Sequence, residues 1–244
     1  YLPGGVRLTS ASIPEYCAGG ARAFHRSLEV GGSKARTPAK LAYAVLPRCS
    51  DETELTATAS HELLEATTNP DPVERGFAFA RDSSNLAFTA SGLEPVDPCG
   101  LITMDGHWTL DSGFAVQRAW SNRAAALGHD PCVPARRNRP YVALVPRTPT
   151  VRLVGEGERV TITLDAKADR PVPKWATSVL DVTGFHEHAQ YVDVSLDRSV
   201  VQDGDSVNLT IVVRKRNENG LVVVGAVSTL GVSSHMWPVA IVTR

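Results

Sequence analysis

The last two-fifths of the chain alternate hydrophobic and polar positions with the period of two that is typical of β-strands. Short β-branched runs such as RVTITLDA (159–166) and SVNLTIVV (206–213) are separated by the turn sequences GEGE, QDGD and NENG. About seven such strands in fewer than about 100 residues are the pattern of a β-sandwich. We therefore predict an all-β sandwich domain over residues 148–244.

The earlier part of the chain is irregular, and one helix stands out in it. Asp51 followed by Glu54 has the spacing of a capping box, which predicts a helix start. Apolar residues then recur at near-helical intervals, at Leu55, Ala59, Leu63 and Ala66. The pair Asn69–Pro70 ends the pattern, because a proline disfavours helical geometry in the residue before it.

Two further regular segments and a connection complete this outline. LAYAVL (41–46) reads as a buried strand, and AVQRAW (115–120) as a helix or a strand. PARRNRPYVALVPRTP (134–149) contains four prolines and is typical of a domain connection. We therefore divide the chain into residues 1–147 and 148–244.

Composition and charge exclude several classes of function. The chain has 244 residues, of which 43% are hydrophobic and 21% charged, and its formal net charge is -1. No global field therefore favours nucleic acid or an anionic membrane surface. No apolar run approaches the roughly 20 residues that span a bilayer. We expect neither a nucleic-acid partner nor a membrane span.

The four cysteines indicate an oxidising compartment. They all lie in the first part of the chain, and no two have the C-x-x-C spacing of zinc ribbons or redox motifs; they are Cys17, Cys49, Cys99 and Cys132. An even number of widely spaced cysteines suggests two disulfides, and four free buried thiols are the alternative. Counting alone does not separate the three possible pairings.

The predicted helix carries a polar trio within an alanine-rich run. His61, Glu62 and Glu65 are spaced H-E-x-x-E, one residue type away from the H-E-x-x-H helix of zinc proteases. Residues four apart share one helix face, so His61 and Glu65 can bind one metal ion. Zinc accepts imidazole nitrogen and carboxylate oxygen, and Glu62 would act as the general base. The alternative is that the trio forms only the solvated face of the helix.

A third ligand is expected in SGLEPVDPCG (91–100). We favour Glu94 as the ligand and Asp97 as the residue that orients His61 through its second ring nitrogen, although the two roles could be exchanged. His25 is a further candidate, as a fourth ligand or as a histidine satisfied by hydrogen bonds.

Three motifs together resemble a known family. TATASHELLEATTNPDP (56–72), EPVDPCG (94–100) and FAVQRAWSN (114–122) are similar to segments of secreted H-E-x-x-E metalloproteases of bacteria and of the plant phosphate-induced, EXORDIUM-like proteins. YCAGGARAFH (16–25) corresponds loosely to an upstream C-G-x-x-H-like element of that family. The resemblance covers roughly residues 15 to 133.

The resemblance implies a fold, a location and a pairing. It implies an α+β zincin-like domain with zinc at the H-E-x-x-E helix, and it implies secretion. It makes Cys99–Cys132 the expected bridge, which leaves Cys17–Cys49. Family members carry more sheet upstream, so we expect a domain that lacks its N-terminal part, with an upstream fragment of the same precursor as a possible partner. VSLDRSVVQDGDSVNLTIVV (194–213) resembles bacterial immunoglobulin-like surface modules.

Two functional hypotheses follow. In the first, the protein is a secreted zinc-dependent peptidase that acts on protein or peptide substrates, and its sandwich attaches it to a surface or a substrate. In the second, it is a non-catalytic extracellular binding or adhesion protein with a cell-surface partner and a structural metal. That metal would be zinc, or calcium bound by the carboxylates of Glu65, Glu94 and Asp97.

Overall fold

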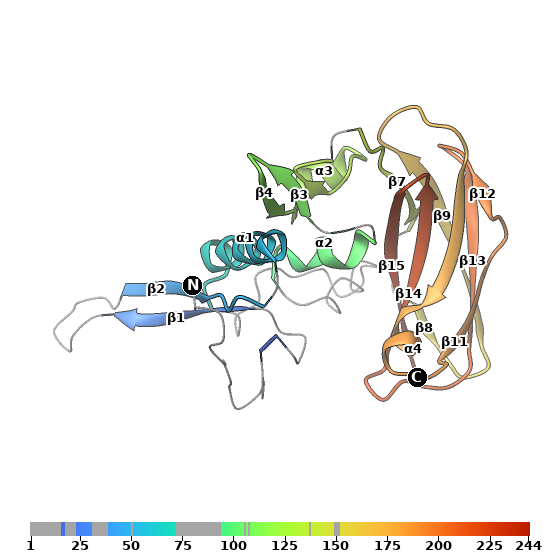
Figure 1. The fold of residues 1–244 in the computed structure, drawn as a ribbon. Helices are drawn as coiled ribbons and strands as arrows, with labels where there is room; N and C mark the ends of the chain where they lie inside the picture. The colour runs from blue at the N-terminus through green and yellow to red at the C-terminus, as the bar shows by residue number, and fades with distance from the viewer. Residues whose placement is uncertain are drawn as a thin grey trace. The chain divides into compact units, whose positions relative to one another are not determined.

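The computed structural model describes the chain over residues 16–17, 23–30, 39–49, 51–71, 94–104, 106, 108–136, 138–148 and 152–244. These residues divide into two compact units (Figure 1). The first contains the described residues up to 71 together with 94–96 and 108–119, and the second contains 97–106 and 120–244. The predicted boundary near residue 147 stays a prediction. The opening residues, on which the expectation of a missing upstream part rests, lie outside the described ranges.

The first unit is built around one long helix. Strands β1 (Phe24–Val30) and β2 (Ala39–Val45) pair antiparallel, with Phe24 opposite Val45. Helix α1 (Glu52–Thr68) follows, and strands β3 (Trp108–Asp111) and β4 (Phe114–Gln117) form a hairpin. The predicted helix is thus confirmed, and the segment 115–120 is extended rather than helical.

Two hydroxyl groups attach α1 to β4. The backbone N–H of Ala115 donates to Thr56 Oγ1 at 3.2 Å, and that of Gln117 donates to Ser60 Oγ at 2.6 Å. Thr56 and Ser60 are four residues apart and therefore share one face of α1. Hydroxyl groups of α1 thus accept hydrogen bonds from two backbone N–H groups of β4, which would otherwise need a further strand as their partner.

The predicted α+β zincin-like fold is wrong. The structure is mostly β, and in the described part of the first unit the strands form two separate antiparallel pairs beside α1 rather than one larger sheet covered by helices. The physical reason is that H-E-x-x-E specifies the chemistry of one helical turn and its immediate neighbours. It does not specify which strands pair elsewhere in the unit.

The second unit contains the predicted β-sandwich. The five-stranded sheet has the order β12 (Val200–Val201), β10 (Trp175–Asp181), β14 (Leu221–Leu230), β15 (Ser233–Thr243) and β8 (Arg152–Val154). The four-stranded sheet has the order β11 (Val192–Leu196), β13 (Ser206–Val213), β9 (Arg159–Ala168) and β7 (Val142–Pro146). Strand β8 runs parallel to β15, and all other neighbouring strands in these two sheets are antiparallel.

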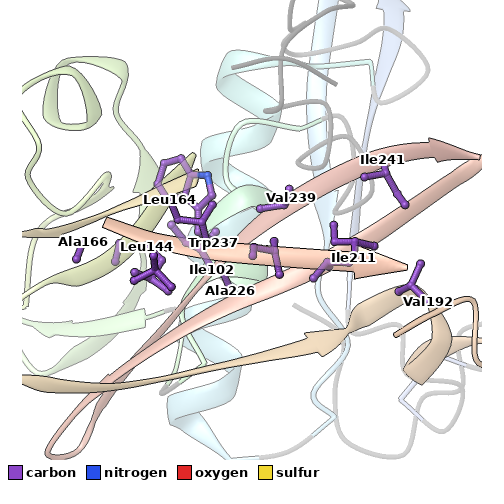
Figure 2. Packing of buried hydrophobic residues seen from close by; sticks show 14 of the residues in the cluster. Ile102, Leu144, Leu164, Ala166, Val192, Ile211, Ala226, Trp237, Val239 and Ile241 are labelled. Atoms are coloured by element: carbon purple, nitrogen blue, oxygen red, sulfur yellow. The ribbon is translucent and has the colours of Figure 1, made fainter. Parts of the chain in front are cut away.

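The core lies between these two sheets (Figure 2). Strand β13 shows the expected alternation, with Val207, Leu209, Ile211 and Val213 buried. Strands β14 and β15 are buried almost throughout, because a second cluster covers their other face. In that cluster, Val182 from α4 (Val182–His186) packs with residues of β14 and β15, and Leu101 from α2 (Asp97–Ile102) packs against it.

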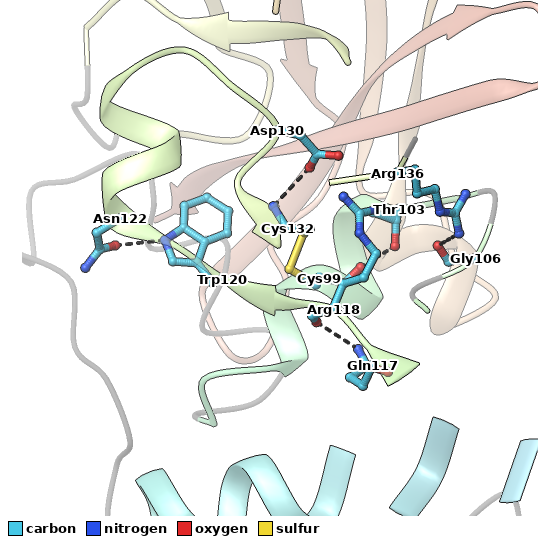
Figure 3. The surroundings of a disulfide bond; sticks show 10 residues. All are labelled: Cys99, Thr103, Gly106, Gln117, Arg118, Trp120, Asn122, Asp130, Cys132 and Arg136. Atoms are coloured by element: carbon cyan, nitrogen blue, oxygen red, sulfur yellow. Dashed lines mark hydrogen bonds between the residues drawn. A yellow bond between two sulfur atoms is a disulfide. The ribbon is translucent and has the colours of Figure 1, made fainter. Parts of the chain in front are cut away.

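A disulfide-bonded segment packs on the sandwich. Cys99 and Cys132 form a disulfide, and Asp130 Oδ1 accepts the Cys132 N–H at 2.9 Å (Figure 3). The segment also contains α3 (Asn122–Ala126), β5 (Ala119–Trp120) and β6 (Cys132–Val133). The Met104 N–H donates to the Ser234 carbonyl at 3.2 Å, which joins the end of α2 to β15.

The predicted disulfide pairing is confirmed. Cys17–Cys49 is the second bridge, and it lies in the first unit. Each disulfide therefore joins two cysteines of the same unit. Within the described ranges, none of the helices has the length and apolar character needed to cross a membrane.

Gly184 offers a test of the local geometry of α4 and its cap. A Cβ at this position would clash with the Ala189 carbonyl oxygen and the Asp181 carboxylate. We expect Gly184→Ala to lower the free energy of unfolding by about 1–3 kcal/mol, because the backbone around α4 would have to shift to accommodate the added methyl group. Urea unfolding monitored by tryptophan fluorescence measures this change.

The matched control is Gly100→Ala. Gly100 lies in α2 with open space around its Cα, so the same added methyl group should be neutral or stabilise by up to about 1 kcal/mol. Equal destabilisation by the two substitutions would contradict this description of α4.

Candidate metal centre

Helix α1 brings a histidine and two glutamates to the interior of the first unit. The helix begins at a well-formed cap, in which Asp51 Oδ1 accepts the Glu54 N–H at 2.9 Å. Glu62 and Glu65 lie on its buried side, with 7% and 1% of their surface exposed, while His61 is half-buried. Buried carboxylates require a proton, a hydrogen-bond donor or a cation. The trio is therefore not merely the solvated face of the helix.

The pair His61 and Glu65 has the geometry of two ligands of one cation. His61 Nε2 lies 3.1 Å from Glu65 Oε2. The other carboxylate oxygen, Glu65 Oε1, is buried and has no hydrogen-bond partner among the residues that the structure describes. A cation beside this carboxylate would compensate the burial of its charge. The donor set thus fits a metal such as zinc, which accepts one imidazole nitrogen together with carboxylate oxygens.

His25 lies at the centre of the cluster, although the sequence marked it only as a further candidate. It comes from β1, is 3% exposed, and its Nδ1 lies 3.1 Å from Glu62 Oε2 and 3.7 Å from Glu65 Oε2. Its Nε2 lies 3.0 Å from the Asn69 carbonyl oxygen and 3.0 Å from Glu94 Oε1. The loose match to the upstream C-G-x-x-H-like element was the signal that pointed to His25.

The electrostatics of the cluster affect Glu62 in particular. Burial raises the pKa of the Glu62 carboxyl group above its ordinary value, and the neighbouring Glu65 carboxylate acts in the same direction. The charge of His61 and the hydrogen bond from His25 oppose this rise. A general base works best when its pKa is close to the working pH, so a raised pKa suits Glu62 to proton transfer.

The structure brings together four of the sequence-predicted residues of this site. His61, Glu62, Glu65 and Glu94 all belong to the first unit, and Glu94 enters the cluster through its contact with His25. Asp97 begins α2 and belongs to the second unit. The choice between Glu94 and Asp97 as third ligand stays a prediction. With two imidazoles nearby, the cluster suits zinc better than calcium, which prefers oxygen ligands.

Comparisons with known proteins identify no family for this chain. No family model matches it, and no curated protein matches it. Solved structures with partial likeness include domains 4 and 5 of the S-layer protein SbsC, with 12% identity, a TM-score of 0.32, and 43% of this chain and 53% of that chain covered. The titin M3 domain has 10% identity and a TM-score of 0.26, with 43% of this chain and 97% of that chain covered. These scores are too low to support a conclusion about this protein.

The attachment of α1 to β4 can be tested at Ser60. Replacing Ser60 by alanine removes the acceptor of the Gln117 N–H and leaves that donor without its partner in a part-buried position. We expect Ser60→Ala to destabilise the first unit by about 1–3 kcal/mol. Hydrogen exchange at the Gln117 amide measures the effect directly.

Thr67→Ala is the control on the same helix. The Thr67 hydroxyl group donates only to the Leu64 carbonyl of its own helix, at 2.9 Å in an exposed position. This substitution should change stability by no more than about 0.5 kcal/mol. If Gln117 exchanged equally fast in both variants, the Ser60 contact would not hold α1 on β4.

Proposed function

We propose that this protein is an extracellular zinc-dependent peptidase whose metal is bound at helix α1. The observation that carries the proposal is the carboxylate of Glu65, which is almost fully buried, lies one turn from His61 and leaves one oxygen without a hydrogen-bond partner in the described part of the chain. Such a carboxylate is costly unless a cation compensates it. The proposal does not depend on a zincin fold.

In this proposal, each residue of the cluster has its own role in metal binding or proton transfer. His61 and Glu65 hold the metal, with Glu94 as the favoured third ligand and Asp97 as the alternative. Zinc bound there would act as a Lewis acid toward the peptide carbonyl group and make water a better nucleophile at neutral pH. Glu62 accepts the proton of the attacking water and returns it to the leaving amine. His25, at 3.1 Å, holds the Glu62 carboxylate in place.

Location and attachment follow from the rest of the molecule. Two disulfides are typical of proteins that mature in an oxidising compartment, which supports an extracellular location. The sandwich of the second unit would then attach the enzyme to a cell surface or to its protein substrate. The sequence resemblance to secreted H-E-x-x-E proteases supports the same assignment.

A second candidate is a non-catalytic extracellular binding protein with a structural metal. The observation in its favour is that His25, Glu62 and Glu65 are all buried. Structural zinc sites are closed, whereas catalytic sites keep one position open to water and substrate. The two candidates therefore differ in whether Glu62 transfers protons or only maintains the cluster.

Glu62→Gln separates the two candidates. The substitution preserves the shape of the side chain but removes its ability to accept a proton. We expect the purified protein to contain zinc and to cleave a peptide library, and we expect Glu62→Gln to lower kcat by about 100-fold or more. Metal analysis by mass spectrometry and cleavage assays of both proteins provide the measurements.

Glu52→Gln is the matched control. Glu52 is an exposed glutamate in the first turn of the same helix, so its amide variant should cleave peptides like the unaltered protein. Peptide cleavage that is equal in all three proteins would refute the role of Glu62. Zinc without cleavage of any peptide would support the structural-metal candidate.

A further inference from the structure

The hydrogen bonds of His25 define which of its ring nitrogens can bind a cation. Its Nε2 lies 3.0 Å from the backbone carbonyl oxygen of Asn69, which can only accept a hydrogen bond. Nε2 therefore carries a proton. In the neutral ring, the other nitrogen, Nδ1, then has a lone pair and can act as a ligand.

That lone pair faces two carboxylate oxygens. His25 Nδ1 lies 3.1 Å from Glu62 Oε2 and 3.7 Å from Glu65 Oε2, and ligand atoms of these three buried residues all lie within 4.8 Å of one another. In the absence of metal, a proton shared by His25 Nδ1 and Glu62 Oε2 holds this pair together, and a cation that displaces this proton would be bound by all three atoms. Zinc bonds of about 2.0–2.2 Å in tetrahedral geometry place neighbouring ligand atoms about 3.3–3.6 Å apart, so the observed spacing needs little adjustment.

The surroundings of His25 are those of a metal-binding histidine. A ligand histidine usually donates its other N–H to a backbone carbonyl or a carboxylate, which fixes the ring and makes its free nitrogen a stronger ligand. His25 has both kinds of group at Nε2, because Glu94 Oε1 also lies 3.0 Å away. Glu65, the carboxylate that this site would share with the site at His61, has one buried oxygen, Oε1, without a hydrogen-bond partner in the described residues.

We infer that His25, Glu62 and Glu65 form a second divalent-cation site that takes zinc and shares Glu65 with the proposed site at His61. The inference rests on the proposed function only in its consequence for catalysis. A cation bound to Glu62 prevents this carboxylate from accepting a proton. The second site is therefore inhibitory, and zinc in excess of one equivalent slows the peptidase.

Zinc stoichiometry tests the second site without reference to activity. The full chain is stripped of metal with a chelator, dialysed against buffered free zinc, and analysed by mass spectrometry for bound metal. We expect two equivalents in the unaltered protein and one equivalent in His25→Ala, in Glu62→Gln and in His61→Ala. His129→Ala, which removes an exposed histidine of the second unit, should retain two equivalents.

The outcomes distinguish the inference from the proposed function. If the unaltered protein binds one equivalent of zinc, and His25→Ala retains it whereas His61→Ala loses it, the second site is refuted and the proposed metal at α1 remains. If the unaltered protein binds one equivalent of zinc, and His25→Ala loses it whereas His61→Ala retains it, the inferred site is supported and the site at His61 is refuted. A protein that binds no zinc would overturn both.

Folding of the variants is controlled within the same experiment. Circular dichroism and thermal unfolding are compared for all proteins, because His25 is buried. If His25→Ala does not fold, Glu62→Gln decides the question, since it keeps the side-chain shape and removes only the charged ligand. Two equivalents of zinc in Glu62→Gln would then contradict the inferred site.

Discussion

The first unit depends on the compensation of one buried negative charge. Glu65 is 1% exposed, and the imidazoles of His25 and His61 both lie within 4 Å of its carboxylate. An isolated carboxylate in such a place would cost several kcal/mol or would take up a proton. Strand β1 and helix α1 thus meet around a cluster of polar side chains, and this explains why an alanine-rich helix tolerates two glutamates on its buried side.

The position of the helix follows from short-range chemistry that the sequence displays. The Asp51 cap and the stop at Asn69 are local features, and each was found where its residue type predicts it. The alternation along β13 and the pairing of the four cysteines could likewise be predicted. These features could be predicted because each depends on neighbouring residues or on a recognisable motif.

The features that escaped prediction depend on contacts between distant residues. His25 and Glu62 are 37 positions apart, and nothing in the spacing of either residue indicates that their side chains meet. The H-E-x-x-E spacing describes one turn of α1, so it could not indicate that two separate strand pairs would lie beside the helix in the described part of the first unit. Strands β14 and β15 lack the expected alternation for a related reason: α2 and α4 cover a face that a simple sandwich would expose to water.

Burial also determines the side from which a substrate can reach the cluster. His25, Glu62 and Glu65 are nearly inaccessible, whereas the side chain of His61 is 28% exposed. If the protein acts as the proposed peptidase, its substrate would approach over His61, the most exposed of these four side chains. Under the proposed function, water would reach Glu62 by the same route, and His61 and Glu65 would hold the cation where this route ends. A cation held at His25 lies deeper, and it can stabilise the unit or block the base but cannot itself meet a substrate.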